Sequence, residues 1–128
     1  MKRQLIKLTL LILLTSCTTD KRIEKYGRLI DDCDKITIYK LTDNSDNLIK
    51  EIGDKDELKN LKDILKRNVK PELQKKFKAD KRFDIIKHDK VIGQILINDT
   101  GDEPFANFVT DDFGFGFRLT YGIGMYFN

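Results

Sequence analysis

The amino-terminal stretch, residues 1–17, constrains this chain most, because it decides how much of the sequence is left to fold. Three basic residues precede an apolar run, residues 8–14, that only Thr9 interrupts. That run is far shorter than the roughly 18–20 apolar residues that a membrane-spanning helix needs. A basic start, a short apolar stretch and small residues after it are typical of a secretory signal peptide. We therefore expect residues 1–16 to be removed from the mature protein.

The end of this stretch, Leu14-Thr15-Ser16-Cys17, places an aliphatic residue and two small ones before a cysteine. It resembles the lipobox of bacterial lipoproteins, and the resemblance ends at Cys17. It implies that cleavage falls before Cys17, that the Cys17 thiol is lipidated, and that the new amino terminus is acylated as well. Two or three acyl chains would hold the protein in the cell envelope, on a bacterial membrane and outside the cytoplasm, since one chain alone binds only marginally. The alternatives are an ordinary signal peptide with a chance cysteine, or a cytosolic protein with an apolar amino terminus.

Removal of the signal also changes the charge and the cysteine content. Without its first 16 residues the 128-residue chain retains 112, the size of one ordinary domain. The net charge of +3 is accounted for by Lys2, Arg3 and Lys7, so the mature chain is formally neutral and an argument for nucleic-acid binding fails. With Cys17 lipidated, Cys33 has no partner for an internal disulfide, and stability must come from burial.

The pattern after Cys17 predicts a polar tether and then one α+β domain. Residues 18–28 are mostly polar and charged, and we expect the lipidated cysteine and the tether over residues 17–30, with the domain over residues 31–128. Alternation or apolar character predicts strands over residues 35–41, 48–52, 83–88, 91–98, 104–109 and 113–120. Residues 71–79 suggest a short helix with Leu73 and Phe77 packed inward. The expected fold is an antiparallel meander of about five or six strands with one main helix on one face.

The clearest regular element is a helix from Asp54 to about Asn68. Asp54 can cap it, and Glu57 can complete a capping box. Leucines recur at the spacing of one apolar stripe, while lysines fall on the other side (Leu58, Leu61 and Leu65; Lys55, Lys59, Lys62 and Lys66). The basic side could bind anionic lipid head groups or an acidic protein. The alternative is a solvated lysine face that keeps the protein soluble.

The carboxyl-terminal part offers the best candidate for a contact surface. Phe113, Phe115 and Phe117 alternate with residues that leave the other side of the strand bare at two glycines. A bare face permits close approach by another backbone or by a ligand, although a core strand with a bent neighbour explains the same pattern. Aromatic residues follow, and aromatics are favoured in interfaces. The candidate contact residues are Gly114, Gly116, Arg118, Tyr121 and Tyr126.

The sequence does not assemble a catalytic or metal site. His88 is the only histidine, and no serine or second ligand is tied to it by position. Asp99-Thr100-Gly101 copies the triplet of aspartic proteases, but Asn98 and Asp102 depart from the flanking residues of that family. Three carboxylates surround Cys33 without the convergent nitrogen or sulfur ligands that zinc needs. We therefore expect no enzyme, no cofactor and no metal.

Three functions remain in descending order. The first is a non-catalytic, membrane-anchored binding module that recognises a protein or another component of the cell envelope. The second is an inhibitor or immunity-type lipoprotein that blocks a toxin or hydrolase outside the cytoplasm. The third is an enzyme, which would need an acid, base or nucleophile cluster that one histidine and scattered aspartates do not supply.

Overall fold

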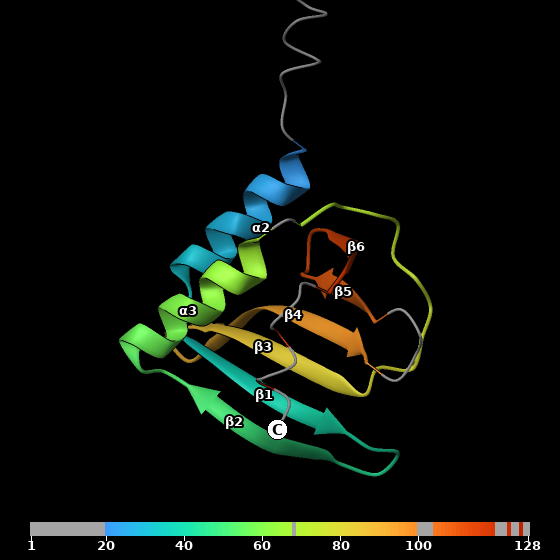
Figure 1. Cartoon of the computed structure of the whole chain (residues 1–128), viewed down its shortest axis with the longest axis horizontal. Coiled ribbons are helices and arrows are strands. Elements are labelled where there is room, and N and C mark those ends of the chain that lie inside the picture. The colour runs from blue at the N-terminus through green and yellow to red at the C-terminus, as the bar shows by residue number, and fades with distance from the viewer. Residues whose placement is uncertain (1–19, 68, 100–103, 120–122, 124–125, 127–128) are drawn as a thin grey trace, which may run out of the picture.

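The computed structural model describes residues 20–67, 69–99, 104–119, 123 and 126. Two helices lie against one six-stranded antiparallel sheet, which confirms the α+β prediction (Figure 1). In chain order the elements are α2 (Lys21–Asp32), β1 (Lys35–Leu41), β2 (Asp46–Ile52), α3 (Lys55–Lys66), β3 (Lys81–Lys87), β4 (Lys90–Asn98), β5 (Phe105–Val109) and β6 (Gly114–Arg118).

The sheet departs from a simple meander at one place. The strand order is β2-β1-β3-β4-β5-β6, so β1 pairs with β2 on one side and with β3 on the other. Helix α3 and the segment 69–80 after it carry the chain from the edge strand β2 past the other edge strand, β6, and back to β3, and from there the strands follow in sequence. His88 and Asp89 join β3 to β4, and both have positive φ (50° and 62°), as the tightest hairpin loops require.

The core lies between the helices and one face of the sheet. Alternate residues of β1, β3, β4, β5 and β6 point into it, and nine of these side chains are fully buried: Ile36, Ile38, Phe83, Ile85, Ile95, Ile97, Ala106, Phe108 and Phe115. Tyr26 of α2 sits at the centre, with its ring edge-on to Phe108 at a centroid distance of 4.7 Å. Its hydroxyl donates to the Leu65 carbonyl at 2.7 Å, and burial raises the pKa of Tyr26 far above its usual range.

Helix α2 corrects the prediction of a tether over residues 17–30. From Lys21 onward this segment is a helix that belongs to the domain, and its Tyr26 and Ile30 are buried (1% and 0% exposed). Asp20 caps the helix by accepting from the backbone N–H of Arg22 at 2.9 Å. The apolar residues are too few to raise the mean hydropathy of the segment, but their spacing places them on one side.

Helix α3 has the predicted apolar stripe, with Leu58, Leu61 and Leu65 buried. Asp54 is the cap and accepts from the Glu57 backbone N–H at 3.1 Å. On the opposite side, however, Lys62 Nζ donates to the carbonyl oxygens of Asp31 (2.9 Å) and Cys33 (2.7 Å). This lysine therefore satisfies the carboxyl-terminal carbonyls of α2 and is not simply solvated.

Residues 69–80, which we call the strap, form an extended segment where a short helix was predicted for residues 71–79. The strap runs along the edge strand β6, where Glu72 and Gly116 exchange two backbone hydrogen bonds (2.7 and 2.8 Å). The Asn107 side chain then binds the backbone N–H and carbonyl of Lys75 (3.2 and 2.7 Å). The helix prediction was wrong because these long-range bonds satisfy the backbone, and Leu73 is 85% exposed.

Candidate interaction face

The predicted contact surface at Gly114 and Gly116 is covered by the strap. A Cβ atom on Gly116 would lie 2.6 Å from the Leu73 carbonyl oxygen, and one on Gly114 would collide with the Gln74 side chain. The bare side of β6 therefore admits another backbone, one of the two possibilities that the sequence left open. That backbone belongs to the same chain, so the two glycines are not free to receive a partner.

The remaining residues of that prediction do not form an accessible patch either. Tyr126 is buried at 7% exposure within the core cluster, with Lys50 Nζ 5.8 Å from its ring centroid. Arg118 is exposed and pairs with Glu72 of the strap at 3.5 Å. Tyr121 lies outside the described residues. The prediction was wrong at Tyr126 because its ring is packed in the core and is therefore not exposed to a partner.

A different surface, in which exposed and buried side chains are mixed, lies on the side of the sheet away from the helices. We call it the open face; it consists of the residues that alternate with the core residues on β2, β1, β3 and the first part of β4. The strap contacts β4, β5 and β6, and its carboxyl-terminal end also reaches β1 and the β1–β2 loop, where Asp80 accepts from the Leu41 backbone N–H at 2.8 Å and Lys78 pairs with Asp43. On the open face itself Leu48 and Val91 are 56% and 46% exposed, whereas Thr37, Asp84 and Ile86 are buried. The members are Lys35, Thr37, Tyr39, Leu48, Glu51, Arg82, Asp84, Ile86, Val91 and Gln94.

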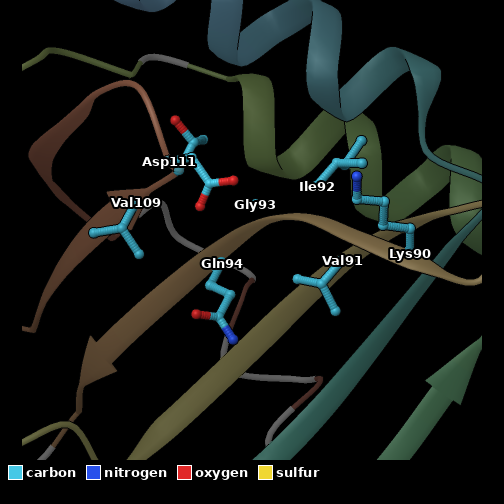
Figure 2. A pocket seen from close by; sticks show the side chains of 8 residues that line it. Lys90, Val91, Ile92, Gly93, Gln94, Val109 and Asp111 are labelled. Atoms are coloured by element: carbon cyan, nitrogen blue, oxygen red, sulfur yellow. The ribbon is translucent and has the colours of Figure 1, made fainter.

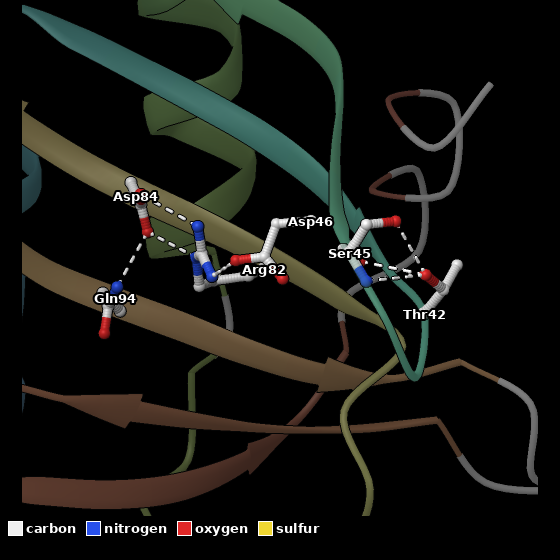
Figure 3. A network of polar contacts seen from close by, with 6 residues as sticks. All are labelled: Thr42, Ser45, Asp46, Arg82, Asp84 and Gln94. Carbon is white, nitrogen blue, oxygen red and sulfur yellow. Dashed lines mark hydrogen bonds and ion pairs between the residues drawn. The ribbon is translucent and has the colours of Figure 1, made fainter.

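Arg82 is the centre of a polar network on this face (Figure 3). Its Nε donates to Asp84 Oδ1 at 2.9 Å, and its Nη1 donates to Asp46 Oδ2 at 2.7 Å. Gln94 Nε2 donates to the same Asp84 oxygen at 3.0 Å, so side chains of β2, β3 and β4 are joined. Burial works against the charge of Arg82, but these carboxylates outweigh it and raise the pKa of the guanidinium.

An aromatic and a hydroxyl group flank this network on β1. The guanidinium carbon of Arg82 lies 4.6 Å from the Tyr39 ring centroid, a cation–π contact. Thr37 stands opposite Asp84 in the register, and among the described residues its buried hydroxyl has no hydrogen-bond partner. Arginine and tyrosine held beside exposed apolar side chains are the composition that protein interfaces favour.

A hollow of about 350 Å³ lies beside the open face, where β4 extends past the end of β5 (Figure 2). Val91 and Gln94 project to the side of the open face, while Lys90 and Ile92 project to the other side. Val109 and Asp111 close the hollow on the β5 side. Its size is at the lower limit for a small-molecule site, and its walls carry no cluster of titratable groups.

The residues that the sequence singled out for chemistry are scattered. His88 is 82% exposed, and its backbone N–H donates to Asp34 at 3.0 Å, which lowers the pKa of that carboxyl. The Cys33 thiol is buried, donates to the Ile30 carbonyl at 3.1 Å, and has its pKa raised by burial. Asp99 is 3.4 Å from Lys81 Nζ, far along the chain from both. Among the described residues no group of histidine, cysteine, aspartate or glutamate side chains could hold a metal ion.

Cys17, the predicted lipidation site, lies outside the described residues. Within residues 20–67, 69–99 and 104–119, neither helix has the length and apolar character to cross a bilayer. No protein-family model, curated protein or solved structure matches this chain.

Proposed function

We propose that this protein is a small lipoprotein of the bacterial cell envelope that binds a protein partner through the open face and catalyses no reaction. The lipidated residue is Cys17, and the acyl chains hold the domain on the outer side of a membrane. The partner is a protein because the face combines the exposed apolar side chains of Leu48 and Val91 with an arginine held against a tyrosine, a composition that protein interfaces favour. The observation that carries the proposal is the contact of the Arg82 guanidinium with the Tyr39 ring on a face whose Leu48 and Val91 side chains are exposed.

The proposal is supported by the network that holds the polar groups of the open face in place, which an ordinary solvated surface does not need. A face that served only as solvated surface would gain little from a three-strand network, since isolated surface ion pairs contribute at most about 1 kcal/mol. Here Arg82 and Asp84 are mostly buried, with 19% and 10% of their side chains exposed. Their bonds fix the guanidinium beside Tyr39, and such preorganisation lowers the entropy cost of binding.

Site-specific photo-crosslinking in cells tests the binding surface. A crosslinking residue is placed at Leu48 or Val91 of the open face, and at Lys59, which is exposed on α3, as the matched control. We expect one adduct of the same mass from both open-face positions and none from Lys59. Equal labelling at all three positions, or no adduct at Leu48 and Val91, would contradict the proposal.

The identity of that adduct separates the two binding functions. An extracytoplasmic toxin or hydrolase would make the protein an inhibitor or immunity-type lipoprotein, whereas an envelope component would make it a scaffold or receptor module. The anchor is tested independently by labelled palmitate, which should enter the wild-type protein and not a Cys17→Ser variant. Equal incorporation into both would remove the anchor from the proposal.

A further inference from the structure

The outward side of α2 carries charges in an unusual order. Lys21, Lys25 and Arg28 are exposed along its first two turns, whereas Asp31 and Asp32 are exposed at its end. A helix dipole favours acidic groups at the amino-terminal end and basic groups at the carboxyl-terminal end. Apart from Asp20 and Glu24, α2 has the opposite arrangement, so its exposed basic groups are not placed to stabilise the helix itself.

At the carboxyl-terminal end the compensation lies within the domain. Lys66 of α3 forms an ion pair with Asp31, and Lys87 of β3 lies 3.5 Å from Asp32. Lys62 adds a positive charge at the last carbonyls of the helix. The acidic end of α2 therefore has basic partners supplied by the neighbouring elements.

The amino-terminal end differs. Asp20 caps the backbone and pairs with Arg22 at 2.9 Å, so neither group is available to an outside ligand. Lys25 lies 5.5 Å from the Phe113 ring centroid, and within the described part of the chain no ion pair joins Lys21 or Arg28. The basic stripe Lys21, Lys25 and Arg28 is thus open to an anionic surface.

The position of the anchor identifies that surface. Only three residues separate Cys17 from Lys21, and a fully extended chain spans about 3.3–3.6 Å per residue. The start of α2 therefore lies within roughly 14 Å of an acylated Cys17, close to one or two Debye lengths of the bilayer surface. We propose that the basic stripe of α2 docks on anionic lipid head groups and orients the domain on the membrane; this inference rests on the proposed lipid anchor.

Docking through α2 is compatible with binding through the open face. Helix α2 packs on the core side of the sheet, and the open face is on the other side (Figure 1). A membrane beneath the amino-terminal end of α2 therefore leaves the open face uncovered. On α3, by contrast, Lys62 and Lys66 bind α2, and Lys55 and Lys59 of its lysine stripe stay exposed.

The test uses residues 17–128 with Cys17→Ala, so that acylation does not hold the protein on the membrane. Binding is measured by co-sedimentation at low ionic strength with vesicles of phosphatidylglycerol and with vesicles of phosphatidylcholine. We expect binding to the anionic vesicles alone, and a loss of more than about tenfold in partitioning for Lys21→Glu/Lys25→Glu. The control Lys55→Glu/Lys59→Glu makes the same charge change at exposed positions of α3 and should alter partitioning by about twofold or less.

The outcomes are decisive in each case. Equal losses of partitioning in the two double variants would contradict docking through the basic stripe, since binding would then depend on net charge alone. Absence of binding by the parent protein, or equal binding to both lipids, would also overturn it. Circular dichroism shows that each variant is folded. Palmitate labelling of Cys17 reports on the anchor separately, so failure of the anchor is distinguishable from failure of the stripe.

Discussion

The two faces of the sheet are closed by different means. On the core face, α2 and α3 bury apolar side chains against Phe108, Phe115 and their neighbours. On the other face, the strap covers part of the sheet through backbone and amide hydrogen bonds, and the rest is the open face. Burial of apolar area contributes roughly 25 cal/mol per Å², whereas a hydrogen bond contributes about 1 kcal/mol net. The core face should therefore determine stability, and the other face should be free to serve recognition.

The largest effect is expected in the core, for Phe108→Ala. The ring is fully buried, contacts Tyr26 edge-on, and fills the space above Gly93. Its loss should lower the free energy of unfolding by about 3–5 kcal/mol in urea titrations. Val91→Ala on the open face is the control and should cost less than about 0.5 kcal/mol. Similar losses in the two variants would contradict the division between the faces.

The next effect concerns the strap, for Gly116→Ala. The added methyl would meet the Leu73 carbonyl oxygen and the Phe105 ring at 2.6 Å, so the strap has to move. We expect a loss of about 1–3 kcal/mol and faster hydrogen exchange at the Lys75 amide. Gly27→Ala is the matched control, because it is helical with nothing within 4 Å of the new methyl, and should stabilise the protein by up to about 1 kcal/mol. An unchanged Lys75 amide would show that the strap is not held at Gly116.

A smaller effect is expected at the centre of the open face, for Arg82→Ala. Asp84 would keep its bond from Gln94 but lose its charged partner. The cost should be about 1–2 kcal/mol, since both groups retain some contact with water. A double-mutant cycle with Asp84→Ala should give a coupling energy of at least about 0.5 kcal/mol. A coupling energy near zero would mean that the network does not hold the guanidinium in place.

The smallest effect on stability is expected for Asp34→Asn, in the turn between α2 and β1. The backbone N–H of His88 lowers the pKa of the folded Asp34 carboxyl below its unfolded value of 3.8. The stabilisation is therefore complete above pH 3.8 and is lost as the pH falls through the folded pKa. Asp34→Asn should show a shallower loss of stability on acidification, measured as urea midpoints. His88→Asn keeps the backbone donor and should behave as wild type; a change there would assign the shift to the imidazole.

The sequence predicts the elements whose pattern is local. Alternation identified the strands, and Asp54 with the leucine spacing identified α3. Helix α2 was missed because a few apolar residues lie in a strongly charged segment, although Ile23, Tyr26 and Ile30 have helical spacing. The strap and the burial of Tyr126 depend on bonds and contacts between distant residues, which no local pattern encodes. The open face depends on which strands the strap leaves uncovered, so it could not be predicted either.

The bridge between Glu72 and Gly116 also bears on self-association. Exposed strand edges are templates for runaway pairing, and a sheet can grow without limit only when both of its edges are available. Glu72 forms hydrogen bonds with the backbone groups of Gly116 on β6. Among the described residues, β2 is the only edge strand without such a backbone contact on its outer side. Edge-to-edge pairing of this domain should therefore stop at two copies. At high local concentration this limits fibre growth without any loss of the open face.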